Sequence, residues 1–139
     1  MAKLRIAPLK GHEAFPKVFK KSKKFTGRDA VLFVEFSLLE SESDILKTVS
    51  LGVGIRKKTA RKAVMRNRVK RLLRTAMRNF LKNMAAGGNV PFTAIIAIWQ
   101  SAPEHPLQLR LEYVEQALWP LLEQARQYAI TYFSQDRTR

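Results

Sequence analysis

The sequence predicts an α+β fold: a small mixed sheet packed with helices, in the order α-β-β-α-β-α, with space for one extra short strand. Segments rich in β-branched and aromatic residues alternate with segments whose apolar residues recur at helical spacing. A length of 139 residues, 46% of them hydrophobic, fits a single domain over residues 1–139 with one core. Within that domain we expect residues 1–10 to form a flexible basic tail.

The first helix and the first strand are predicted from residues 11–39. Phe15, Val18 and Phe19 lie three and four positions apart and mark one face of a short helix, and Pro16 falls in its first turn. Gly27 ends that segment, and a strand follows over residues 29–39. Alternation gives this strand a core face with Ala30, Leu32, Val34, Phe36 and Leu38, and a mixed face with Val31, Phe33, Glu35 and Ser37.

The second strand is predicted over residues 46–55, where apolar and small or polar residues alternate strictly. Its inward residues are Val49, Leu51, Val53 and Ile55, and its outward residues are Ser50, Gly52, Gly54 and Arg56. Because two of the outward residues are glycines, we expect another group to lie against the backbone there.

A long helix is predicted from about Thr59, its N-cap, to about Met84, with Gly87 and Gly88 ending it. Its apolar stripe consists of Val69, Leu72, Leu73, Ala76, Met77, Phe80, Leu81 and Met84. Residues 90–100 read as a buried strand. A last helical region, about residues 109–133, has Leu111, Val114, Leu118, Leu122, Ala125 and Ala129 near helical spacing, and Pro120 is expected to kink or restart it.

The charge of the chain points to a polyanionic partner. It has 26 Lys and Arg against 11 Asp and Glu, a net charge of +15. The excess is uneven, since residues 1–84 hold 22 bases and 6 acids whereas residues 85–139 hold 4 bases and 5 acids. We therefore expect the first part of the chain to meet the polyanion.

Several classes of chemistry are excluded by composition. The chain has no Cys, so it has neither disulfides nor thiolate sites, and His12 and His105 have no metal-ligand spacing. The sequence shows neither a membrane-spanning run nor a secretory signal, so we expect a cytoplasmic protein without a membrane partner.

The predicted long helix has an unusual basic face. Residues 63–78, "AVMRNRVKRLLRTAMR", carry six bases and no acid, and residues 45–103 carry 13 bases and no acid. Opposite the apolar stripe, helical projection places Asn67, Arg68, Arg71, Arg74, Arg78 and Lys82. Like charges one turn apart repel, so a phosphate partner is favoured over a merely solvated face. Arg66 projects into the apolar stripe, and it either points into an open groove or forms a buried ion pair.

Aromatic residues lie beside lysines in the first third of the chain. Phe15 and Phe19 precede a lysine-rich stretch (Lys20, Lys21, Lys23 and Lys24), and Phe33 lies on the mixed strand face. Aromatic rings flanked by cations suit single-stranded nucleic acid, whose bases stack while its phosphates pair. The alternative is that Phe15 and Phe19 simply dock the first helix.

The segments "LGVGIRKK" (51–58) and "RNRVKRLLR" (66–74) resemble the protein component of bacterial ribonuclease P, whose signature is an Arg-Asn-Arg helix after a strand and a basic pair. The upstream "FPKVFKKSKKFTGRDAVLFV" shares the resemblance, which covers roughly residues 9–84. It implies an α+β fold with a left-handed crossover. It also implies a subunit of an endoribonuclease that removes the 5′ leader of precursor tRNA, with the catalytic centre on the RNA and none on this chain.

The resemblance and the basic face together give the expected site residues. RNA contacts are expected from Lys57, Lys58, Arg61, Lys62, Arg66, Asn67, Arg68, Lys70, Arg71, Arg74 and Arg78. A cleft for the single-stranded leader is expected at Phe15, Phe19 and Phe33. The implied partners are the catalytic RNA and precursor tRNA, with Mg²⁺ bound mainly by the RNA and no organic cofactor. We expect the protein to be monomeric when free of RNA.

The main alternative is a ribosomal or general RNA-binding protein with no processing role. It accounts equally well for the charge and the size, but it does not require the Arg-Asn-Arg spacing or an aromatic cleft for one loose strand. A DNA-reading helix fits less well because arginines occur at every turn, which suits phosphates better than base edges. An autonomous nuclease lacks the necessary acids and histidines.

Overall fold

The computed structural model describes residues 4–10, 13–36, 47–56, 58, 60–87, 90–101 and 109–137. The elements are β1 (Leu4–Pro8), α1 (Ala14–Lys21), β2 (Lys23–Thr26), β3 (Ala30–Phe36), β4 (Lys47–Ile55), α2 (Ala63–Gly87), β5 (Phe92–Trp99) and α3 (Leu111–Arg137). In this part of the chain, no helix is both long and apolar enough to span a membrane.

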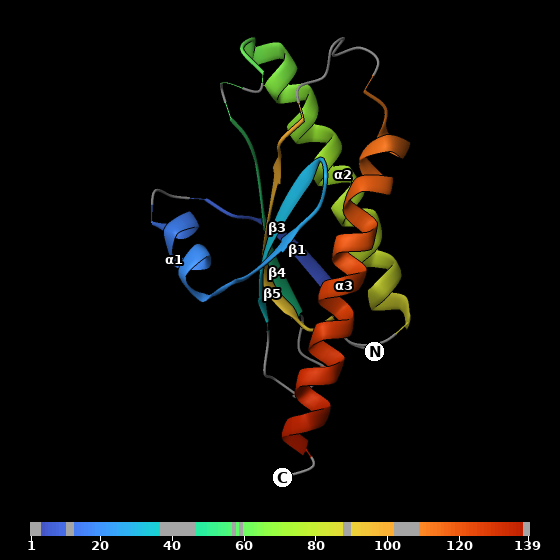
Figure 1. Cartoon of the computed structure of the whole chain (residues 1–139). Helices are drawn as coiled ribbons and strands as arrows, with labels where there is room; N and C mark the ends of the chain where they lie inside the picture. Colours follow the sequence, from blue (N-terminus) through green and yellow to red (C-terminus); the bar gives the residue numbers. More distant parts are fainter. Residues whose placement is uncertain are drawn as a thin grey trace.

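The five strands form one mixed sheet in the order β1-β4-β5-β3-β2. β1, β4 and β5 are parallel neighbours, β3 is antiparallel to β5, and β2 is antiparallel to β3. Because parallel neighbours need a crossover, α2 connects β4 to β5. Figure 1 shows α2 and α3 side by side on one face of the sheet and α1 on the other. The predicted α+β fold is confirmed.

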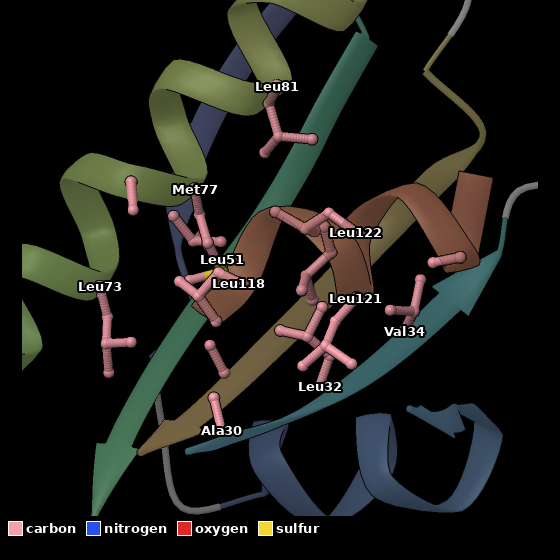
Figure 2. Packing of buried hydrophobic residues seen from close by; sticks show 14 of the residues in the cluster. Ala30, Leu32, Val34, Leu51, Leu73, Met77, Leu81, Leu118, Leu121 and Leu122 are labelled. Atoms are coloured by element: carbon pink, nitrogen blue, oxygen red, sulfur yellow. The ribbon is translucent and has the colours of Figure 1, made fainter. Parts of the chain in front are cut away.

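The main core lies between the sheet and the pair α2 and α3. Figure 2 shows Leu32 of β3, Leu51 of β4, Met77 of α2 and Leu118 of α3 within this packing. The predicted apolar stripe of the long helix is confirmed, because Val69, Leu73, Ala76, Met77 and Leu81 are buried. Alternation in β3 and β4 delivers the inward residues, as expected for strands with one face on a core.

The opposite face of the sheet carries a smaller cluster built around α1. Val18 is buried against Ala94 and Ile96 of β5, and Phe15 packs at the edge of this cluster. A Cβ placed on Gly52 would lie 3.0 Å from two ring carbons of Phe15. The glycine of β4 therefore lets the Phe15 ring lie on the sheet, so the group expected against this backbone is the chain's own first helix.

Two strands and one boundary differ from the sequence-based expectations. The prediction of a flexible tail over residues 1–10 is wrong for Leu4–Pro8, because this segment pairs with β4 as β1. A second missed strand, β2, pairs with β3 just after α1. The long helix begins at Ala63, not near residue 59. Before it, the Ala60 N–H donates to the Arg56 carbonyl at 3.2 Å. Thr59 and Gly88 lie outside the described residues.

The last helix is continuous through Pro120 and does not restart there. Proline removes one N–H, so the carbonyl of Gln116 loses its helical donor. Both residues are exposed, so water can serve that carbonyl. Leu118, Leu121 and Leu122 are buried on either side of Pro120 and hold both halves of the helix on the core.

Candidate RNA interface

The exposed face of α2 is strongly basic. The helix contains seven Lys or Arg and no acidic residue. We call its exposed set Asn67, Arg71, Arg74, Arg78 and Lys82 the basic face, with Lys70 half-buried at its side. The basic face lies opposite the stripe that packs on the core, so the packing of α2 turns these side chains outward. An ion pair seen within the described residues, Arg126–Glu123, lies on α3.

The turn that leads into α2 extends the basic face. Lys58, Arg61 and Lys62 are exposed, whereas Lys57 lies outside the described residues. The first turn of α2 contains no acidic side chain. The positive end of the helix dipole favours anions. An N-terminus that is preceded by Lys58, Arg61 and Lys62 and has no acid in its first turn therefore favours binding of an external anion.

Two of the expected RNA contacts, Arg66 and Arg68, bond to the protein's own backbone. Nη1 of Arg66 donates to the carbonyl of Ala60 at 3.0 Å and to that of Arg61 at 2.7 Å. Nη2 of Arg68 donates to the carbonyl of Leu109, just before α3, at 2.9 Å. Both side chains are half-buried. The contacts seen for Arg66 are thus with carbonyl oxygens rather than with the carboxylate of the buried ion pair considered from the sequence.

The three predicted aromatic residues come together on the α1 face of the sheet. The rings of Phe19 and Phe33 meet edge to face with centroids 4.7 Å apart, and Phe15 lies 6.3 Å from Phe19. Nζ of Lys24 lies 5.9 Å from the Phe33 centroid. Phe19 is 38% exposed, whereas Phe15 and Phe33 are half-buried. This aromatic cluster both docks α1 and presents one open ring, that of Phe19, while the cation lies near the neighbouring ring of Phe33.

A polar cluster that sequence reasoning missed joins the start of β3 to the start of α3. The Asp29 carboxylate accepts hydrogen bonds from the Ser101 hydroxyl and, at 3.0 Å, from the Tyr113 hydroxyl. The hydrogen bond to Asp29, and then its charge, raise the pKa of Tyr113. These partners are 72 and 84 positions apart in the chain, so no local pattern could reveal them.

A basic helix face and a cation-flanked aromatic cluster, on opposite sides of one α+β sheet, define an RNA-binding protein. The family model described as Ribonuclease P matches residues 5–125. The ribonuclease P protein component of Microcystis aeruginosa is 36% identical over 83 residues, which cover 60% of this chain and 67% of the relative. That of Prochlorococcus marinus is 32% identical over 98 residues, covering 64% and 70%.

Solved structures show the same fold. The ribonuclease P protein of Staphylococcus aureus superposes with a TM-score of 0.60 at 20% identity, covering 87% of this chain and 96% of that one. The Thermotoga maritima protein gives a TM-score of 0.62 at 21% identity, covering 84% and 96%. The chain therefore belongs to the bacterial ribonuclease P protein family, and it is a subunit of the ribozyme complex that matures tRNA 5′ ends. Membership of this family implies that the ribonuclease P RNA is its partner.

Proposed function

We propose that the basic face of α2, with Lys58, Arg61 and Lys62, binds the ribonuclease P RNA, while the aromatic cluster binds the single-stranded 5′ leader of precursor tRNA. The observation that carries this proposal is the uniform charge of α2: its core stripe is buried, and every charged side chain on the helix is basic. The two surfaces lie on opposite faces of the sheet, so one protein can contact the catalytic RNA and the substrate at once.

Electrostatic repulsion within α2 supports a phosphate partner. Arg71, Arg74 and Arg78 lie three and four positions apart, and each like-charged pair at that spacing destabilises a helix by a few tenths of a kcal/mol. RNA phosphates relieve this repulsion and release counterions. If about six phosphates are neutralised, the slope of log K against log salt concentration is around −4 to −5.

The open ring of Phe19 supports leader binding on the other face. A base stacked on an aromatic ring contributes about 1–3 kcal/mol, and a nearby lysine can pair with the phosphate. Phe33 packs against the edge of Phe19 and holds it in place, and Lys24 lies over Phe33. Stacking of this kind tolerates any base.

Magnesium chemistry is proposed to reside on the RNA. Mg²⁺ prefers several oxygen ligands in octahedral geometry. Within the described residues, no three His, Asp or Glu side chains lie close enough together to hold a metal ion. The Asp29 carboxylate accepts hydrogen bonds from Ser101 and Tyr113. We therefore propose that the described residues bind and position RNA, and that oxygen atoms of the RNA hold Mg²⁺. A net charge of +15 also favours a monomer when RNA is absent.

Salt-dependent binding to ribonuclease P RNA tests the assignment of the basic face. Each removed phosphate contact should reduce the slope by about 0.7–0.9. We therefore expect the Arg71→Gln, Arg74→Gln, Arg78→Gln triple variant to lose about 2–3 from the slope and to bind more weakly at every salt concentration. Single Arg74→Gln and Arg126→Gln variants form a matched pair, because both remove one arginine from a helix on the same sheet face. Equal slopes for these two single variants would reject the basic face as the contact.

Discrimination between precursor and mature tRNA tests the aromatic cluster. In the holoenzyme, Phe19→Ala should weaken binding of precursor tRNA about tenfold, the equivalent of about 1.4 kcal/mol of lost stacking, and should leave mature tRNA unaffected. Tyr128→Ala is the control, because Tyr128 is also 38% exposed but packs with Phe25 on the other face of β2. Equal losses for the precursor and the mature tRNA would place the leader elsewhere.

A further inference from the structure

We propose that Arg66 is a positioning residue, which orders the basic turn before α2 so that Arg61 and Lys62 meet the RNA, rather than a phosphate contact in its own right. This inference rests on the proposed role of the basic face and refines it. The residues of the Arg66-Asn67-Arg68 segment differ in what they contact. Asn67 is exposed on the basic face, while Arg66 turns back onto the protein.

The Arg66 side chain folds back and donates hydrogen bonds to the turn that precedes α2. One guanidinium nitrogen bonds two successive carbonyls, those of Ala60 and Arg61, six and five residues upstream. Ala60 is almost fully buried, with 1% of its surface exposed. A carbonyl near buried surface needs a donor, and Arg66 supplies it from inside the helix.

The same turn is also held from its other end. The Ala60 N–H donates to the Arg56 carbonyl at 3.2 Å, and the Arg66 N–H donates to the Lys62 carbonyl at 3.1 Å, which opens α2. Arg66 therefore closes a short loop whose exposed members, Arg61 and Lys62, carry charge toward solvent. An ordered turn loses less conformational entropy when RNA binds than a loose one does.

Arg68 also donates a hydrogen bond to backbone that precedes a helix, in this case α3. Its guanidinium bonds the carbonyl of Leu109, a buried residue at the entry to α3. Two arginines two positions apart thus each close onto the backbone that leads into a helix. Such use of the guanidinium is specific to arginine, because its planar set of donors can bond two acceptors in fixed directions, whereas lysine offers a flexible point charge.

A double-mutant cycle on ribonuclease P RNA binding separates positioning from direct contact. We compare Arg66→Gln in the wild-type background and in an Arg61→Gln, Lys62→Gln background, with Arg74→Gln as the matched control in both. Positioning predicts that Arg66→Gln weakens binding about tenfold in the wild type but less than about twofold once the turn's charges are gone. Arg74→Gln should cost the same factor in both backgrounds. Equal costs of Arg66→Gln in the two backgrounds would overturn the proposal.

Two further readouts keep the test independent of folding and of the RNA assignment. Arg66→Lys retains the charge, so a phosphate contact predicts near-normal binding, whereas positioning predicts a loss close to that of Arg66→Gln. In the free protein, amide hydrogen exchange at Ala60 should speed up about tenfold in Arg66→Gln and stay unchanged in Arg74→Gln. An unchanged exchange rate of the Ala60 amide in Arg66→Gln refutes the ordering of this turn by Arg66, even if the basic face proves not to bind RNA. If Arg74→Gln does not weaken RNA binding, the proposed function of the basic face is refuted, whatever the result for Arg66.

Discussion

Alanine substitutions at the two outward glycines of β4 should have opposite effects on stability. At Gly52, the new Cβ would lie 3.0 Å from Cε1 and Cζ of Phe15 and 3.1 Å from Cδ2 of Leu9. At Gly54, the nearest atom would be Cγ1 of Ile98 at 3.8 Å, an ordinary contact. Overpacking costs about 1–3 kcal/mol, while replacing glycine by alanine at an unstrained position stabilises by about 0.4–1 kcal/mol through the unfolded chain. We expect Gly52→Ala to destabilise by about 1–2 kcal/mol and Gly54→Ala to stabilise slightly.

Urea and thermal unfolding of the two variants measure this difference directly. For a chain of this size, a gap of about 2 kcal/mol corresponds to melting temperatures about 6–10 °C apart. Phe15→Leu should recover part of the loss in the Gly52→Ala background, because the smaller side chain relieves the contact, and should destabilise the wild type. Equal stabilities of Gly52→Ala and Gly54→Ala would refute the packing of Phe15 on Gly52, and with it the account of how α1 is docked.

Three further predictions concern the anchoring and the charges of α3. Trp119→Phe should lower the free energy of unfolding by about 1 kcal/mol, because the Trp119 indole N–H donates to the carbonyl of Ala76 on α2 at 3.3 Å. An unchanged urea midpoint would exclude this hydrogen bond. Tyr113 has a raised pKa, so its hydrogen bond should stabilise the fold below pH 10 and be lost as the pH rises through the raised value. An absorbance titration of the phenols should show that Tyr113→Phe removes one that titrates above the ordinary pKa of 10.0. Unfolding should show that the stability lost in this variant at neutral pH disappears at high pH. The hydrogen bond from Arg126 lowers the pKa of Glu123 from its ordinary 4.5, so Glu123→Gln should lose stability above that pH and converge with the wild type in more acidic solution. The loss of stability in Glu123→Gln should be small because the side chains of Glu123 and Arg126 are exposed. A loss that persists in acid would contradict the ion pair.

Periodicity was sufficient for the elements that bury a continuous stripe. In α2, spacing alone places Val69, Leu73 and Met77 in the core and turns Arg71 and Arg74 outward, as the structure shows. The same reasoning predicted β3, β4 and β5, because their residues alternate or are apolar throughout. The outward side of α2 could therefore be derived before any partner was considered.

Elements that depend on pairing or on distant partners could not be predicted in this way. β2 has four residues and exists because Lys23–Thr26 pairs with β3, while β1 was assigned to a tail although Leu4 and Ile6 alternate with other residues. The role of Arg66 depended on where α2 begins. Since that start lies at Ala63, the carbonyls of Ala60 and Arg61 come within reach of the guanidinium, and spacing within the helix could not reveal these contacts.

Multiple-turnover cleavage of a precursor tRNA by a bacterial ribonuclease P RNA, at low Mg²⁺, tests the central claim most directly. Wild-type protein should stimulate cleavage at the mature 5′ end. The Arg71→Gln, Arg74→Gln, Arg78→Gln variant, with a melting temperature no lower than that of the wild type, should stimulate it poorly, and Arg126→Gln should act as the wild type does. If the triple variant stimulates cleavage as fully as the wild type, the basic face of α2 is not the surface that holds the catalytic RNA.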